Sequence, residues 1–161
     1  MATSGMLIAG DDIPEPYDRF RNRVMFPIPD WRGRLIAFGG RALDPEAPAK
    51  YLNSPETPLF HKGRVLFGLA QAREAAHNKG RVLVVEGYMD AIALSEAGFP
   101  EVVAPLGTAL TEEQIALLWK VAPEPILLFD GDTAGQRAAL RAAMRALPML
   151  KPGHSLRFAT V

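Results

Sequence analysis

The second half of the chain repeats a short apolar strand followed by a helical segment three times, and this pattern limits the possible folds more than any other feature. Largely continuous apolar strands are typical of a sheet that is buried on both faces. Thr111 and Gln114 form the pattern of a capping box at the start of the middle helix. The expected strands and helices are 81–86 and 88–97, 101–104 and 112–121, and 125–129 and 133–147, with a further strand at 155–161. This order predicts an α/β fold with a mostly parallel sheet.

The first half of the chain predicts a smaller α+β subdomain. Residues 23–43 contain two apolar runs around a Pro-Asp-Trp-Arg-Gly turn, which predicts a β-hairpin. Residues 44–64 are rich in proline and are expected to be irregular. A helical composition at 67–79 ends at Gly80, a residue suited to close a helix. We therefore divide the chain into an irregular leader at 1–16, an N-terminal subdomain at 17–80 and a parallel-sheet domain at 81–161.

The composition describes a globular protein with an uneven charge. Of the 161 residues, 48% are hydrophobic, and no membrane span or signal peptide is visible, so we expect a cytoplasmic protein without a membrane partner. The absence of cysteine excludes disulfides, thiolate zinc sites and thiol nucleophiles. Residues 19–64 hold nine Lys and Arg against four Asp and Glu, whereas residues 81–161 hold seven against nine. A basic half suits a polyanion, and an acidic half suits metal cations.

Four carboxylates lie near the ends of two expected strands. Glu86 ends one strand and Asp90 begins the next helix, while the stretch LLFDGDTAG at 127–135 places Asp130 and Asp132 after a later strand. The carboxyl ends of parallel strands meet at one edge of the sheet, where α/β folds bind ligands. Because alternate strand residues share a face, we expect Asp130 and Asp132 to point the same way.

Such acids repel one another unless a cation lies between them. Two carboxylates about 6 Å apart at an effective dielectric constant of about 20 repel by roughly 3 kcal/mol. Carboxylates with open positions for phosphate oxygens are typical of a Mg²⁺ site, and two metals would form a phosphoryl-transfer site. Structural roles also remain open, because Glu86 can cap a loop, Asp90 can complement a helix dipole and Asp132 can cap the following helix.

A glutamate after one parallel strand and an Asp-x-Asp after a later one resemble the Toprim domain of primases, topoisomerases and some nucleases. More widely, residues 17–158 resemble the RNA polymerase domain of the bacterial DnaG-type primase family. The segments that carry the resemblance are YDRFRNRVMFPI (17–28), GRLIAFGGRAL (33–43), KYLNSPET (50–57), LFHKGRVLFGL (59–69), VVEGYMDAIAL (84–94), PLGTALT (105–111) and FDGDTAGQRAA (129–139). The family fold is a basic α+β subdomain followed by a Toprim-type α/β sheet.

The resemblance implies a polymerase that makes short RNA primers on single-stranded DNA from ribonucleoside triphosphates. In that family the acids matching Glu86, Asp130 and Asp132 are catalytic and, together with Asp90, hold two or more Mg²⁺ or Mn²⁺ ions. A ribonucleotide 3′-hydroxyl attacks the incoming triphosphate, so no side-chain nucleophile is needed.

The resemblance also implies that the basic subdomain holds the nucleotides and the template. The residues that match these family positions are Arg23, Arg41, Lys50, Asn53 and Lys62. Tyr51 stands beside Lys50 in a stretch expected to be irregular, and we interpret it as a candidate for stacking on template bases.

Other parts of the family's proteins are expected outside this chain. Zinc is expected only in an upstream module, since the chain has no cysteine. A further Asp-x-Asp, a helical subdomain and a region that binds the replicative helicase are expected downstream. We therefore expect a fragment of a catalytic core that acts at the replication fork in the nucleoid. The fragment alone is expected to fold but to be inactive, with an apolar patch where the downstream helices would pack.

Three alternatives remain open from the residues alone. The same acids would serve a Toprim nuclease or topoisomerase fragment. Asp130 could instead be the phosphorylated nucleophile of a phosphatase-like site, or the chain could be a non-catalytic nucleotide-binding module.

The last expected helix, at 133–147, carries arginine at every fourth position. Arg137, Arg141 and Arg145 are expected on one face, opposite Leu140, Met144 and Leu147. This pattern predicts an amphipathic helix whose arginines are solvated.

Overall fold

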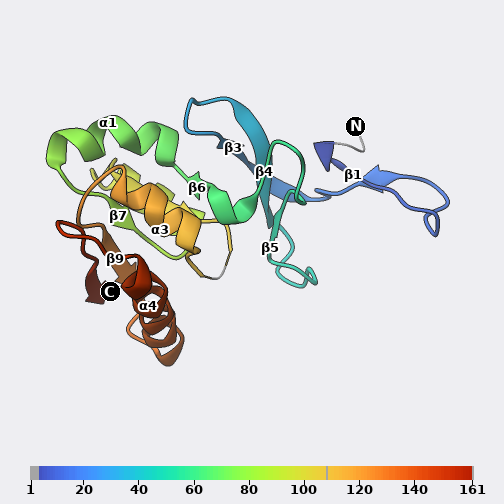
Figure 1. The fold of residues 1–161 in the computed structure, drawn as a ribbon. Helices are drawn as coiled ribbons and strands as arrows, with labels where there is room; N and C mark the ends of the chain where they lie inside the picture. The colour runs from blue at the N-terminus through green and yellow to red at the C-terminus, as the bar shows by residue number, and fades with distance from the viewer. Residues whose placement is uncertain (1–3, 108, 161) are drawn as a thin grey trace. The chain divides into compact units, whose positions relative to one another are not determined.

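The computed structural model describes residues 4–107 and 109–160. The chain forms two compact units, one made of Met1–Asp30 and Arg34–His61 and the other of Trp31–Gly33 and Lys62–Val161. Most strands and helices of each unit are labelled in Figure 1, and the colour bar locates the others by residue number. The larger unit thus begins earlier than the boundary expected near residue 80. The reason is that strand β6 (Leu66–Phe67) pairs with β8 (Val102–Pro105) of the main sheet.

The smaller unit is built on a three-stranded antiparallel sheet with the order β3-β4-β5. The expected hairpin is confirmed, because β3 (Arg23–Pro29) pairs antiparallel with β4 (Leu35–Ala42). The third strand, β5 (Tyr51–Asn53), lies in the stretch expected to be irregular and pairs with β4 so that Arg41 is opposite Tyr51. Three residues between proline-rich flanks are too few to give a recognisable alternation.

The expected irregular leader contains a short strand. β1 (Leu7–Ile8) pairs antiparallel with β2 (Tyr17–Asp18). Gly5 is buried with a φ of +71°, and a Cβ added there would lie 2.5 Å from the Pro55 side chain. Close packing at Gly5 therefore ties the start of the described chain to the smaller unit.

The larger unit contains a five-stranded sheet with the order β10-β9-β7-β8-β6, which confirms the α/β fold class. β7 pairs in parallel with both β8 and β9, β9 pairs in parallel with β10, and the edge strand β6 is antiparallel. The other strands are β7 (Leu83–Val84), β9 (Ile126–Phe129) and β10 (Arg157–Thr160).

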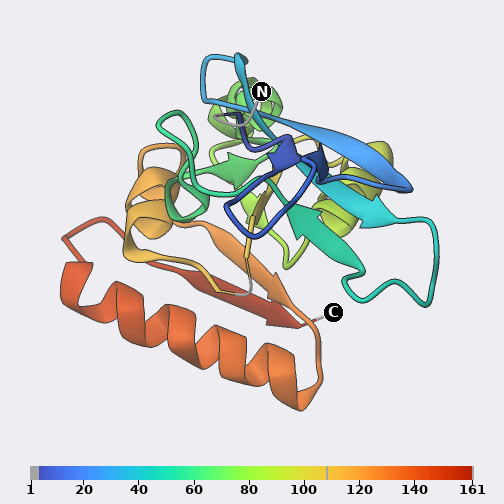
Figure 2. The same cartoon turned by 90° about the vertical axis from the view of Figure 1, so that its right-hand side faces the viewer.

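Helices cover both faces of this sheet. The helices are α1 (Leu69–Lys79), α2 (Tyr88–Glu96), α3 (Glu112–Trp119) and α4 (Thr133–Ala146). Residues of α1, α3 and α4 share one core cluster with Val84 and Leu127, whereas Ala91 of α2 shares another with Leu83 and Val85. Successive strand residues point to opposite faces, so both sides of the sheet are buried. Figure 2 shows α4 running alongside β9 and β10.

Local signals in the sequence set the helix ends. Gly80 closes α1 with a φ of +64°, as expected. At α3 the expected capping box is present, because Thr111 Oγ1 accepts a hydrogen bond from the Gln114 N–H at 3.1 Å and Gln114 Oε1 accepts one from the Thr111 N–H at 3.0 Å. The Gln114 amide also donates to the carbonyls of Lys62 and Val65, at 3.0 and 2.8 Å. One side chain therefore caps α3 and fixes the 3₁₀ helix η2 (Lys62–Arg64).

A buried ion cluster joins the end of α1 to the start of β8. Glu101 is fully buried, and its carboxylate lies 2.7 Å from Lys79 Nζ and 2.9 Å from Arg81 Nη2. Burial alone raises the pKa of Glu101, but hydrogen bonds from Lys79, from the backbone and from Arg81 outweigh it, so the pKa lies below its usual 4.5. Loss of these cations would leave the buried charge of Glu101 uncompensated.

Candidate active site

Two parallel strands bring Glu86 and Asp130 into contact. β7 and β9 are neighbours, with Val84 opposite Leu127, so the chain leaves both strands at the same edge of the sheet. The Asp130 N–H donates a hydrogen bond to Glu86 Oε1 at 3.2 Å. Both residues are exposed at this edge. The expectation that two strands deliver acids to one place is therefore met for this pair.

Asp132 and Gly135 fix the turn between β9 and α4. Asp132 is the N-cap of α4, and its Oδ1 accepts a hydrogen bond from the Gly135 N–H at 2.8 Å. Gly135 is buried, and a Cβ added there would lie 2.0 Å from the Asp130 carbonyl oxygen. The first turn of α4 thus packs directly on the Asp130 backbone, which only glycine permits.

Asp90 has a comparable role in α2. It lies in the first turn, and its Oδ2 accepts a hydrogen bond from the Gly87 N–H at 3.2 Å. A negative charge at this position also complements the helix dipole. The structural role that the sequence left open for Asp90 is therefore observed.

The strand alternation expected for Asp130 and Asp132 does not apply, because β9 ends at Phe129 and Asp132 turns back to cap α4. Within 4–107 and 109–160, no three His, Asp or Glu side chains form a group that could hold a metal ion. The residue types nevertheless suit Mg²⁺, which prefers carboxylate oxygens. At Glu86, Asp90 and Asp132 the hydrogen bond described above uses one carboxylate oxygen, and the other oxygen of each exposed residue is left for a metal.

A hollow of about 320 Å³ opens beside Glu86 at the ends of β7, β8 and β9. Arg141 of α4 lines it together with Glu86 and apolar residues such as Phe129. Arg145 of α4 donates a hydrogen bond to the Leu110 carbonyl. The arginine face of α4 is therefore not simply solvated, as its spacing had predicted, and the hollow contains a cationic side chain that sequence reasoning did not assign to the site.

Three of the predicted nucleotide-binding residues gather on the smaller unit. Arg41 lies opposite Tyr51 on the neighbouring strand, and its guanidinium carbon is 5.9 Å from the Tyr51 ring centroid. Lys50 Nζ is 5.8 Å from the same centroid. Arg41 and Lys50 also line a hollow of about 450 Å³, which Asp44 borders. Tyr51 is a strand residue rather than part of an irregular loop. Its ring is exposed and lies within cation–π distance of both Arg41 and Lys50.

The other predicted residues have structural contacts or lie elsewhere. Arg23 Nη1 lies 3.4 Å from the Gly40 carbonyl and 3.5 Å from the Lys50 carbonyl, so its side chain bridges strands. The Asn53 carbonyl accepts a hydrogen bond from Arg19 Nε at 3.1 Å. Lys62 is exposed in η2 and belongs to the larger unit. The roles of these residues in nucleotide binding stay predictions.

Comparisons with known proteins identify the family to which the chain belongs. A family model described as the DNA primase catalytic core, N-terminal domain, matches residues 1–73, and a model of the Toprim domain matches residues 80–160. The chain belongs to the DnaG-type DNA primases. The two models meet between residues 73 and 80, whereas the compact units divide between residues 61 and 62.

Individual relatives agree with this assignment. The DNA primases of Pseudomonas aeruginosa and Escherichia coli K12 are both 52% identical to the chain, which covers 24% and 26% of their lengths. A solved DNA primase domain from P. aeruginosa matches with a TM-score of 0.92 and 52% identity, over all of this chain and 50% of that one. A solved DnaG primase catalytic domain bound to single-stranded DNA matches with a TM-score of 0.90 and 50% identity, over 99% of this chain and 49% of that one.

The chain therefore spans about a quarter of the curated primases that it matches and about half of the solved catalytic domains. Among its described residues, no helix is long and apolar enough to cross a membrane.

Proposed function

We propose that this chain forms part of the catalytic site of a primase that synthesises short RNA primers on single-stranded DNA by metal-dependent nucleotidyl transfer. The observation that supports this most directly is the hydrogen bond from the Asp130 N–H to Glu86 Oε1, at 3.2 Å. It joins the two strand ends at the sheet edge where α/β folds bind ligands. The family assignment supplies the reaction class.

In this proposal Glu86, Asp90, Asp130 and Asp132 hold two or more Mg²⁺ or Mn²⁺ ions through their exposed carboxylate oxygens. Ions held there would supply the charge that activates a 3′-hydroxyl and neutralises the leaving pyrophosphate. The protein holds the carboxylates of Glu86, Asp90 and Asp132 in place by the hydrogen bond between the two strand ends and by the caps of α2 and α4. Carboxylates held in a fixed geometry position the reactants relative to one another, which lowers the barrier of the reaction.

The hollow lined by Arg41 and Lys50 is the proposed place for a nucleotide triphosphate or a template phosphate, with Tyr51 as a surface for stacking. Arg23, Asn53 and Lys62 are proposed as further contacts. The proposed partners are single-stranded DNA, ribonucleoside triphosphates and the RNA primer, since a similar catalytic domain has been solved with single-stranded DNA bound. For the whole protein we propose, in addition, a region that binds the replicative helicase, a zinc module and action at the replication fork.

Calorimetric titration with Mn²⁺ tests the proposed metal site. Asp130→Asn should weaken Mn²⁺ binding at least about tenfold, the lower bound for residues that only support a metal ligand. Its thermal stability should not fall, because the Asp130 N–H that bonds Glu86 belongs to the backbone. Glu96→Gln, which removes an exposed acid at the end of α2, is the control and should bind as wild type does. Equal Mn²⁺ binding by wild type and Asp130→Asn would show that the site is misassigned.

A further inference from the structure

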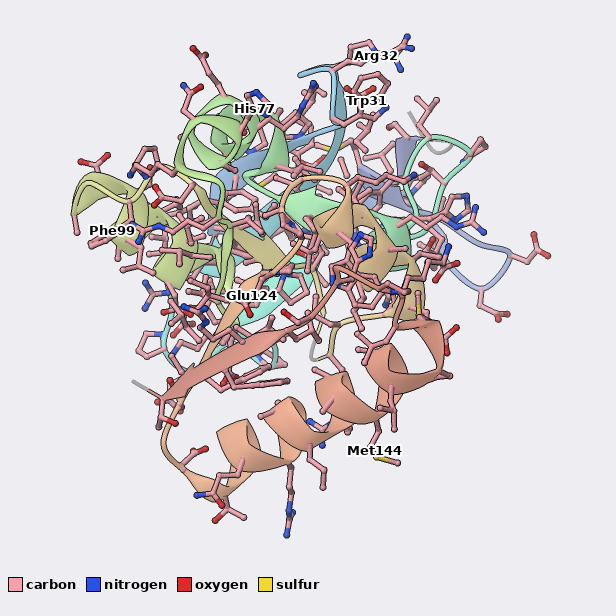
Figure 3. The ribbon with its side chains drawn as sticks, turned by 60° about the vertical axis from the view of Figure 1, so that its left-hand side comes forward. Trp31, Arg32, His77, Phe99, Glu124 and Met144 are labelled. Atoms are coloured by element: carbon pink, nitrogen blue, oxygen red, sulfur yellow. The ribbon has the colours of Figure 1, made fainter. Side chains whose placement is uncertain are left out.

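The tip of the β3–β4 hairpin presents an exposed tryptophan beside two arginines. Trp31 is 52% exposed. The guanidinium carbons of Arg32 and Arg73 lie 4.5 Å and 5.5 Å from the centroid of its ring. Figure 3 shows Trp31 and Arg32 projecting together from the hairpin tip, with His77 on the neighbouring α1. A half-exposed indole offers an apolar, aromatic surface, and tryptophan is enriched at binding interfaces.

The conformation of the tip is fixed. The Asp30 N–H donates to the Arg34 carbonyl at 2.8 Å, and the Arg34 N–H and Nε donate to the Asp30 carboxylate at 2.9 and 2.7 Å. Gly33 supplies the turn with a φ of +83°. From α1, Arg73 Nη1 donates to the Trp31 carbonyl at 3.1 Å. The backbone that carries the indole is thus held in place, which lowers the entropy that a ligand must remove on binding.

A basic hollow adjoins this platform. It has a volume of about 440 Å³ and is bordered by Arg73, His77 and Lys120, with Glu74 as its single acid. Arg73 therefore faces both the indole and the hollow. Lys120 follows the end of α3, where it also compensates the carbonyl dipoles of the helix. An aromatic ring next to a basic hollow offers one surface for a planar base and another for a phosphate.

We propose that Trp31, Arg32 and Arg73, with the adjoining hollow, bind single-stranded nucleic acid as a contact additional to the carboxylate edge. Bases stack on the indole and on the guanidinium planes, and phosphates pair with Arg73 and Lys120. The choice of nucleic acid rests on the proposed function. An acidic protein segment would use the cations but would gain little from the stacking surface, so a single strand fits the combination better.

Binding of an oligodeoxythymidylate in EDTA tests this contact independently of the metal site. In a Trp119→Phe background, fluorescence reports Trp31, and the oligonucleotide should quench it. Trp31→Ala should weaken binding about fivefold or more, the least that one stacked base contributes, while Trp31→Phe should recover part of the loss. Arg73→Ala and Lys120→Ala should each lower the salt slope by about 0.7, as expected for one phosphate on a single strand. Arg137→Ala, an exposed charge on α4, is the control and should change neither affinity nor slope.

Two further probes separate the sources of binding. Inorganic polyphosphate carries the charge without bases, so it should compete without quenching Trp31 and should not respond to Trp31→Phe. Unchanged affinity and slope in a folded Trp31→Ala variant would overturn the proposal. Quenching by polyglutamate with the same dependence on Trp31 would also overturn it, in favour of a protein-docking surface. EDTA removes divalent cations, so oligonucleotide binding at Trp31 is measured without the metal site. The result of the Mn²⁺ titration with Asp130→Asn therefore neither supports nor contradicts this proposal.

Discussion

Replacement of Gly135 by alanine should destabilise the fold, although alanine is the better helix former. An alanine Cβ at this position would lie 2.0 Å from the Asp130 carbonyl oxygen and 2.9 Å from its carbonyl carbon and nitrogen. These atoms belong to the backbone at the end of β9, so no side chain can rotate away. The strand end and the first turn of α4 must separate instead.

The size of the effect follows from this distance. Real Cβ contacts essentially never fall below 3.0 Å, so the two segments must move apart by at least 1.0 Å. Overpacking of this kind costs about 3 kcal/mol, at the upper end of the usual range because backbone has to move. The helix propensity of alanine returns about 1 kcal/mol. A net loss of about 2 kcal/mol lowers the melting temperature by roughly 4–8 °C in a chain of this length.

Thermal unfolding followed by circular dichroism measures this loss, with Gly10→Ala as the control. At Gly10 an added Cβ would lie 3.9 Å from Ile13 Cδ1, an ordinary contact, so the control should unfold as wild type does. Gly135→Ala should also weaken Mn²⁺ binding in the proposed site, because the separation displaces Asp130 from Glu86. A Gly135→Ala variant that melts at or above the wild-type temperature would refute the packing argument.

Two further predictions concern Glu101 and Asp132. The double variant Lys79→Ala, Arg81→Ala leaves the carboxylate of Glu101 buried without its cations and should cost about 3 kcal/mol, the lower end for a broken buried pair because both cations are partly exposed. Since the folded-state pKa of Glu101 lies below 4.5, its contribution is complete above pH 4.5 and is lost as the pH falls through the folded-state pKa. In the double variant no cation offsets the burial of Glu101, so burial raises its pKa above the unfolded value and the pH dependence changes sign. Urea unfolding at several pH values should therefore show a stability that falls as the pH rises through the acidic range, and identical profiles would contradict this account. Asp132→Asn should keep the cap of α4 but weaken Mn²⁺ binding, whereas Asp132→Ala should also lose about 1 kcal/mol of stability. Calorimetry measures the Mn²⁺ binding of both variants and thermal unfolding measures their stability. Unchanged Mn²⁺ binding in Asp132→Asn would show that Asp132 only caps the helix.

Much of the larger unit could be predicted from the sequence because its signals are local. Continuous apolar strands, the capping box at Thr111 and the glycine after α1 each act within a few residues. The capping box and the glycine were found where expected, and the strands lie within one residue of the expected ranges, although the strand expected at 81–86 is only Leu83–Val84. The strand β5 and the pairing of β6 with β8 depend on partners far along the chain. Two or three residues leave no periodic pattern, so only the folded structure reveals such strands.

The orientation of α4 shows how periodicity alone can mislead. The sequence pattern set a solvated arginine face against Leu140, Met144 and Leu147, yet these three side chains are all more than 60% exposed. Figure 3 shows Met144 directed away from the rest of the larger unit. The buried residues of α4 are Gly135, Ala142 and Ala146, because a helix that approaches the sheet closely has room only for small side chains. Hydrophobic spacing identifies a helix, but side-chain volume decides which face is buried.

The caps also change the interpretation of the acidic edge. Repulsion between carboxylates was the reason to expect a cation, but three backbone N–H groups already point at these acids: those of Asp130, Gly87 and Gly135. Each donor places the positive end of an N–H dipole beside a carboxylate oxygen and offsets part of the repulsion. The fold of this edge therefore has hydrogen-bond support that does not depend on a bound metal. A cap occupies one oxygen of a carboxylate and a metal needs only the other, so structural and catalytic roles for the same acid are compatible. It follows that metal binding and fold stability should respond separately to substitution, and a variant such as Asp132→Asn can remove the first while it preserves the second.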